Sequence, residues 1–277
     1  GLEIDTFKRM SEVVAEKYDN PIMTASGPCF AKDVYHKNSL VGLSIAGNNH
    51  EISQEVRDLL HTKHFQVYVN DDIVGVELGG AIKNVYAIMA GMIRAYDIGD
   101  SFLGVYIPRA KVEMNTIMRF LGAKHFSMRK LSDDGDFIIT CDKSSRNFTF
   151  GKTYALQFQT TKNSFIAMKQ TKQDMKNATI EGLYTLKAMY KLIKNFNIFA
   201  PITESLHRVL NCPHMNIDPK IAISKFLDKD SNTRIFETVN GTSETLHKLF
   251  PRYWYRRDKI ELGAFVWEMY NRCKLFF

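Results

Sequence analysis

The chain has 277 residues, of which 45% are hydrophobic and 24% are charged, and its formal net charge is +7. This length allows two modest domains with cores of their own, and the composition is that of an ordinary globular protein. No apolar run approaches the roughly 20 residues of a membrane span, and no basic-then-apolar leader opens the chain, so we expect no membrane association. Because the first residue is Gly1 rather than methionine, we expect the chain to begin inside a longer protein.

The cysteines and the charge bear on the compartment and the partners. The four cysteines lie far apart and form no CxxC pair, so we expect no metal site and a reduced, cytoplasmic protein. The positive charge favours anionic partners, such as phosphorylated metabolites, nucleotides, nucleic acid or an acidic surface. A solvated basic surface would explain the charge equally well.

The first 71 residues have an α/β pattern. Short β-rich runs alternate with one amphipathic helical segment, and strands separated by helices predict parallel βαβ units. The expected elements are a strand at 20–26 that ends at a Gly27-Pro28 turn, a strand at 39–47, a helix at 51–62 and a strand at 65–70.

From residue 72 onward the pattern becomes helical. A long helix over 72–99 is expected, with Asp71 or Asp72 as its N-cap, because a side-chain oxygen there can accept a bond from the first helical turn. Further helices are expected at 105–123, 177–198 and 202–211. We therefore divide the chain into an α/β part at 1–71, a helical domain at 72–211 and a helical C-terminal extension of unknown role at 212–277.

The long helix contains one lysine among small and apolar residues. Lys83 has Gly79, Gly80, Tyr86 and Ala87 as its helical neighbours, and each glycine inside a helix costs about 1 kcal/mol relative to alanine. Either another backbone packs very closely there, or a ligand needs the room. The lysine could project into such a cleft, or its side chain could simply extend to solvent from a buried helix.

A second group of polar residues lies in the segment 133–151. Arg146 offers a planar set of donors that suits a phosphate, Ser145 and Asn147 add neutral donors, and a helix start would add backbone N–H groups. Asp136, ten residues earlier than Arg146, is placed to pair with a lysine. A capped helix start with an exposed arginine is the alternative reading.

Together these stretches resemble the NAD-dependent glycerol-3-phosphate dehydrogenase family. GVELGGAIKNVYAIMAGM (75–92) resembles the family's helix pattern G-V-E-x-x-G-A-x-K-N-V, which is the most specific match. The weaker matches occur in the same order as in the family, over residues 1 to about 210. They are GLE (1–3), ASGPCFAKDV (25–34), GDFIITC (135–141), SSRNFTFGK (144–152), TIEGLYTLKAMY (179–190) and PITESLHRVL (201–210).

The resemblance implies interconversion of dihydroxyacetone phosphate and sn-glycerol 3-phosphate with NAD or NADP as the cofactor. Lys83 matches the family's catalytic lysine, which exchanges a proton with the substrate oxygen, Asp136 matches the carboxylate that orients it, and Asn84 is a polar neighbour. The implied substrate-binding residues are Gly27, Cys29, Lys83, Asp136, Ser145, Arg146 and Asn147. The implied cofactor-binding residues are Ala31, Arg146, Thr179 and Glu181.

Some features depart from the family pattern. No G-x-G-x-x-G turn occurs, so the first half of the Rossmann domain, roughly 100 residues, is expected to lie upstream. Residues 1–71 would then be the C-terminal part of that dinucleotide-binding domain, a remnant of a parallel sheet followed by a larger helical substrate domain. Cys29 stands where a threonine or asparagine is usual, and SDDGD (132–136) adds two carboxylates beside the expected phosphate site.

These departures leave more than one function open. The chain could be the C-terminal portion of a working dehydrogenase, or a non-catalytic descendant that binds a phosphorylated ligand or serves as an oligomerisation module. The aromatic and basic cluster at 252–257 raises nucleic-acid binding, but a single charge cluster is usually a solvated face, so we expect none. A homodimer and either NAD or NADP remain compatible with the sequence.

Overall fold

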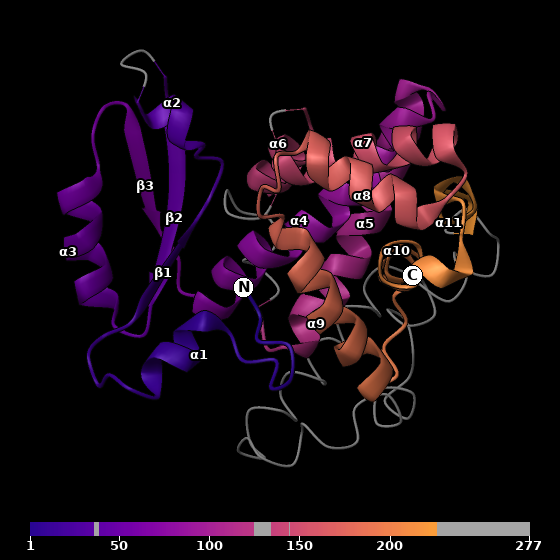
Figure 1. Cartoon of the computed structure of the whole chain (residues 1–277). Helices are drawn as coiled ribbons and strands as arrows, with labels where there is room; N and C mark the ends of the chain where they lie inside the picture. Colours follow the sequence, from indigo (N-terminus) through magenta and orange to yellow (C-terminus); the bar gives the residue numbers. More distant parts are fainter. Residues whose placement is uncertain (36–38, 125–133, 144, 226–277) are drawn as a thin grey trace, which may run out of the picture.

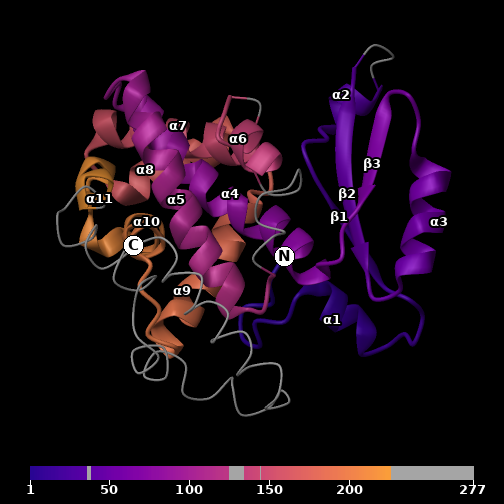
Figure 2. The same cartoon turned by 180° about the vertical axis from the view of Figure 1, so that it is seen from behind.

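The computed structural model describes residues 1–35, 39–124, 134–143 and 145–225. A small α/β part lies beside a larger helical part, as the sequence predicted, and the two views in Figures 1 and 2 show the same separation. The sheet has the order β1-β2-β3, and α3 (His50–Leu60) covers one of its faces. Its strands are β1 (Met23–Ser26), β2 (Val41–Gly47) and β3 (Phe65–Val69).

The sheet is mixed rather than parallel, which corrects one expectation. β2 and β3 are parallel, with Val41 opposite Phe65, and α3 makes the crossover between them. β1 and β2 are antiparallel, with Met23 opposite Gly47. Among its described residues, the connection from β1 to β2 carries only the five-residue helix α2 (Ala31–Tyr35), whereas a crossover between parallel strands usually contains a full helix.

Helix α4 (Ile73–Ala95) is the axis of the helical part. Asp72 is its N-cap, as one of the two predicted candidates, because its Oδ1 accepts a bond of 2.9 Å from the backbone N–H of Gly75. The helix is buried along nearly its whole length, and Figure 2 shows its neighbours from behind. The other helices of this part are α5 (Asp100–Phe120), α6 (Asp136–Thr140), α7 (Arg146–Thr161), α8 (Ser164–Asp174), α9 (Glu181–Asn195), α10 (Pro201–Asn211), a 3-10 turn (Pro213–Met215) and α11 (Pro219–Lys225). Of these, α5, α6, α7, α9, α10 and α11 contact α4.

By length and composition α4 could cross a membrane, although we expected no such segment from the sequence. Within its most apolar stretch, 78% of the residues are buried inside the protein. A helix that is apolar on all sides is buried either in a core or in lipid, and here the surrounding helices bury it. Helix α4 is therefore a core helix of the protein.

The glycines of α4 are explained by protein packing. A Cβ atom at Gly91 would lie 2.0 Å from the carbonyl oxygen of Phe148, and one at Gly151 would lie 1.9 Å from that of Ile88, so the backbones of α4 and α7 touch. A Cβ at Gly80 would lie 2.5 Å from the Ser26 hydroxyl oxygen of β1. Of the two explanations offered by the sequence, close packing holds for these positions.

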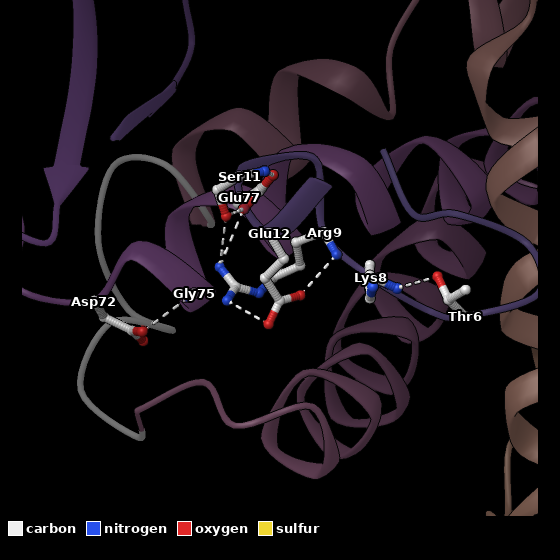
Figure 3. A network of polar contacts seen from close by, with 8 residues as sticks. All are labelled: Thr6, Lys8, Arg9, Ser11, Glu12, Asp72, Gly75 and Glu77. Carbon is white, nitrogen blue, oxygen red and sulfur yellow. Dashed lines mark hydrogen bonds and ion pairs between the residues drawn. The ribbon is translucent and has the colours of Figure 1, made fainter. Parts of the chain in front are cut away.

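The N-terminal segment is fastened to the start of α4, as Figure 3 shows. The guanidinium of Arg9, which precedes α1 (Met10–Ala15), lies 3.1 Å from the carboxylate of Glu77. Ser11 donates to the same carboxylate from its backbone N–H, at 2.9 Å, and from its hydroxyl, at 2.6 Å. Glu77 is only 8% exposed, and these contacts compensate the burial of its charge.

The ends of the helices differ from the predicted ends. α4 stops at Ala95 rather than 99, α5 begins at Asp100 with Pro108 in its interior, and α9 begins at Glu181 rather than 177. The late start of α9 follows from the left-handed backbone of Asn177, with a φ of 54°, which a helix cannot contain. The aromatic and basic cluster at 252–257 lies outside the described residues, whereas Ala222 and Ile223 of α11 belong to the core.

Candidate active site

A buried ion pair lies where the two parts of the chain meet. Lys83, in the middle of α4, pairs through its Nζ with the carboxylate of Asp136, the first residue of α6. The side chains are 15% and 3% exposed, respectively. The hydroxyl of Ser26, at the end of β1, donates to Asp136 Oδ2 at 3.2 Å. Elements from both parts of the chain therefore share one carboxylate.

The environment of Asp136 makes its charge depend on the lysine. Burial raises the pKa of this carboxyl group, while Lys83, Ser26 and Thr140 act in the opposite direction. Thr140 donates to the backbone carbonyl of Asp136 one helical turn earlier. A carboxylate held in this way orients the ammonium group of Lys83 and restricts where it can point.

The N-termini of α7 and α9 converge beside Lys83. Asn147 of α7 donates its Nδ2 to the Oδ1 of Asn84 at 2.9 Å, and it accepts a bond of 3.0 Å from the backbone N–H of Gly182. Asn84 in turn donates its Nδ2 to the Oε2 of Glu181 at 3.2 Å. These bonds join three motifs that are far apart in the sequence. The room is tight, because a Cβ at Gly182 would lie 2.6 Å from the carbonyl oxygen of Asn84.

Two cysteines border the ion pair. Cys29 lies in the loop after β1 and is partly buried. The pKa of its thiol is raised, first by burial and then by the negative charges of Asp136 and Asp33. Burial raises the pKa of Cys141 to about 12, with Lys83 acting in the opposite direction. Both thiols are therefore protonated at neutral pH, and neither is suited to act as a nucleophile.

The start of α7 has the chemistry of an anion site. Ser145 is the N-cap, and its oxygen accepts from the backbone N–H of Phe148 at 3.4 Å, while its hydroxyl hydrogen remains to be donated. Arg146, the first residue of the helix, is exposed. The helix dipole and the N–H groups of the first turn add favourable electrostatics for a negative ligand. This is also the capped helix start with an exposed arginine that the sequence offered as the alternative.

The predicted residues are not all brought together. Gly27 packs on β2, where a Cβ would lie 2.7 Å from the carbonyl oxygen of Gly42. Ala31 begins α2, Thr179 precedes α9, and both are exposed. Within the described ranges, no hydrogen bond or ion pair links either of them to the cluster around Lys83. Sequence reasoning missed Ser26; its only signal was its place at the end of the first strand.

The described residues contain no group of three or more His, Cys, Asp or Glu side chains that could hold a metal ion. Glu181, at the start of α9, accepts a bond from Asn84, and Arg146, at the start of α7, is exposed. In the described part of the chain, the turns after β1, β2 and β3 lack the three-glycine pattern that holds a pyrophosphate on a helix. The described residues therefore do not include the pyrophosphate-binding turn of a dinucleotide domain.

The fold defines the class of protein: a sheet domain joined to a helical domain of the kind found in solved glycerol-3-phosphate dehydrogenases. The enzyme from Coxiella burnetii superposes with a TM-score of 0.73 at 32% sequence identity, covering 83% of this chain and 67% of that one. The enzyme from Saccharomyces cerevisiae has the same fold, with a TM-score of 0.69 at 18% identity over 83% of this chain and 65% of its own.

Sequence comparison then gives the family. A sequence model described as "NAD-dependent glycerol-3-phosphate dehydrogenase C-terminus" matches residues 72–223. The glycerol-3-phosphate dehydrogenase [NAD(P)+] of Staphylococcus aureus (strain USA300 / TCH1516) is 34% identical over 238 residues, which are 84% of this chain and 68% of that protein. The chain belongs to the NAD-dependent glycerol-3-phosphate dehydrogenase family, as its motifs indicated.

Proposed function

We propose that the chain binds the substrate and transfers the proton in a glycerol-3-phosphate dehydrogenase reaction. In that reaction dihydroxyacetone phosphate, NAD(P)H and a proton give sn-glycerol 3-phosphate and NAD(P)+. When bound, the cofactor supplies a hydride to the carbonyl carbon. Lys83 donates a proton to the carbonyl oxygen as negative charge develops there, and in the reverse direction it accepts the hydroxyl proton.

The observation that carries this proposal is the buried pair of Lys83 and Asp136. A buried charge pair contributes little net stability compared with apolar residues of the same shape, so its presence at the junction of the two parts favours a chemical role. Asp136 would orient the ammonium group and touch the substrate hydroxyls. Asn84, whose amide is bonded on both sides, would hold the neighbouring wall of the site.

The phosphate end of the substrate would lie at the start of α7. Ser145 and Arg146 would donate to the phosphate oxygens, and Asn147 would add the second N–H of its amide, since its first is used by Asn84. On the opposite wall, Gly27 and Cys29 would contact the substrate from the loop after β1, next to Ser26. Cys29 stands where a threonine or asparagine is usual in the family pattern, and its thiol would donate more weakly.

For the cofactor we propose contacts from Ala31, Arg146, Thr179 and Glu181 at the nicotinamide end, with NAD or NADP as the carrier. We also propose domain boundaries after residues 71 and 211, a homodimer and a cytoplasmic location. The free thiols of Cys29, Cys141 and Cys212 support the cytoplasmic location, because the cytoplasm keeps thiols reduced.

The test measures two properties of the same preparation. Oxidation of NADH by dihydroxyacetone phosphate reports turnover, and calorimetry with glycerol 3-phosphate reports binding. We expect Lys83→Met to lower turnover at least about 100-fold, as the loss of a general acid does, with little change in the dissociation constant. Lys191→Met, on the exposed surface of α9, is the matched control and should change neither property.

A second function, binding without catalysis, is favoured by one observation: SDDGD (132–136) adds two carboxylates beside the proposed phosphate site. Binding of glycerol 3-phosphate without turnover, and equally by the wild type and Lys83→Met, would support that function. If the chain bound no glycerol 3-phosphate, or if Lys83→Met kept the full rate, the assignment of the site would be wrong.

A further inference from the structure

A cavity lies in the helical part. Its volume is about 380 Å³, within the range of small-molecule sites. Its walls come from α7, α8, α9 and the end of α10, whereas the ion pair lies between α4 and α6. We infer that this cavity binds a small anionic amphiphile, an acyl-type molecule with an apolar chain and one negatively charged head group.

The apolar part of the lining accounts for the chain of such a ligand. Phe150, Met168, Met175, Leu183 and Leu210 line the cavity from four helices. Burying an apolar chain against such side chains contributes about 0.8 kcal/mol per CH₂ group. Methionine side chains adapt to chains of different length, because they have three rotatable bonds and no branch.

The charges of the lining account for the head group. In the described part of the chain, Lys172 and Lys187 line the cavity and no carboxylate does. The charge of Lys187 also acts on the nearby His207, whose pKa is lowered to about 4, first by burial and then by this lysine. A neutral or cationic ligand would gain nothing from these two lysines.

The positions of the two lysines indicate where the head group would lie. Lys172 and Lys187 are both exposed, so a carboxylate or phosphate would bind at the solvent side of the cavity, with the apolar chain directed inward. The neighbouring Nδ2 of Asn211 has no hydrogen-bond partner among the described residues, but it is buried and does not face the cavity.

The turn between α8 and α9 borders the cavity and would respond to a ligand. Asn177, Ala178 and Thr179 line the cavity, and Lys176 and Asn177 have left-handed backbones with φ values of 50° and 54°. This turn leads directly into α9. A ligand held against the turn should slow the exchange of its backbone amide hydrogens.

The test uses the whole chain without substrate or cofactor, because Thr179, proposed above as a cofactor contact, also lines this cavity. Decanoate is titrated in a calorimeter below its micelle concentration, with inorganic phosphate and neutral decanol as the controls for head group and chain. We expect one molecule of decanoate per chain, at least tenfold weaker binding of either control, and slower amide exchange at 176–180. A decanoate affinity no better than that of both controls would overturn the inference.

Variants locate the site. Ala178→Phe fills the cavity and should abolish binding, and the double variant Lys172→Met/Lys187→Met should weaken it about tenfold or more. Lys169→Met is the matched control, since Lys169 lies on α8 outside the lining. Undiminished binding by Ala178→Phe, or loss of binding in Lys169→Met, would place the ligand elsewhere and overturn the inference.

Discussion

Removing the positive charge of Lys83 while Asp136 stays in place gives the most direct test of how the site is built. The carboxylate of Asp136 is 3% exposed and accepts from Ser26 at 3.2 Å, and we expect both features to persist in Lys83→Met. Breaking a buried pair from one side costs about 3–5 kcal/mol, because the remaining charge is uncompensated. We therefore expect the free energy of unfolding at pH 8 to fall by about 3 kcal/mol or more.

The pH dependence of this loss can be stated from the pKa shift. Burial raises the pKa of Asp136 above its ordinary 3.8, and Lys83 opposes that shift, so the variant's carboxyl pKa is higher still. A group whose pKa is raised in the folded state costs stability above that pKa, and the cost disappears as the pH falls toward the unfolded value. The difference between the wild type and Lys83→Met should therefore shrink steadily from pH 8 toward pH 4.

The assay is urea unfolding followed by circular dichroism at several pH values, with a double-mutant cycle. Lys83→Met/Asp136→Leu removes both charges and should recover at least about 2 kcal/mol of the loss in Lys83→Met. Lys191→Met, which breaks the exposed pair with Asp5, should cost at most about 0.5 kcal/mol. If the effects of Lys83→Met and Asp136→Leu added up to that of the double variant, or if the loss in Lys83→Met were independent of pH, the pair would not be coupled and the reasoning would fail.

Three other perturbations test the fold. Gly151→Ala should destabilise the protein by about 3 kcal/mol or more, because its Cβ would lie 1.9 Å from the Ile88 carbonyl oxygen. The control Gly104→Ala, with open space around it, should be neutral or stabilising in the same thermal melt; equal effects would refute the close packing. Glu113→Ala should cost about 2–4 kcal/mol in urea unfolding, because it leaves two backbone N–H groups of α10 without their acceptor, whereas a cost below about 1 kcal/mol would contradict this. His207, whose pKa is lowered to about 4, should make stability fall as the pH drops from 6.5 to 4, and His207→Gln should flatten that part of the urea-measured profile; an unchanged slope would argue against the shift.

The regular elements could be predicted because their signals are local. β2 and β3 appear where short β-rich runs predicted them, and Asp72 caps α4 as its side chain allows. The antiparallel β1 could not be foreseen from the β-rich runs, because residues 27–40 are long enough for either a crossover or a direct return, and the run itself does not show the strand direction. The end of α4 at Ala95 was also missed, because neither glycine nor proline marks it.

The site depends on contacts that the sequence shows only indirectly. The motifs predicted Lys83, Asp136 and Asn147 as site residues; in the structure Lys83 pairs with Asp136, and Asn147 bonds to Asn84, the residue after Lys83. Ser26 was missed because a single serine at a strand end has no distinctive pattern. The sequence could not decide between close packing and room for a ligand at the small residues of α4, since both have the same pattern in sequence; at Gly80 and Gly91 the structure shows close packing.

The close packing at Gly80 and Gly91 also explains how Lys83 is held in a core helix. α4 touches α7 through Gly91 and β1 through Gly80, so both contacts bring backbones or short side chains close to the helix and fix its position on two sides. Lys83 lies between these two glycines in the chain, and its ammonium group meets the carboxylate of α6 at the junction with the sheet. A flexible lysine on a mobile helix would lose side-chain entropy each time it was aligned, whereas here the packing of the helix and the ion pair have already fixed it. The glycines therefore serve the proposed chemistry indirectly, by making the helix that carries the lysine rigid.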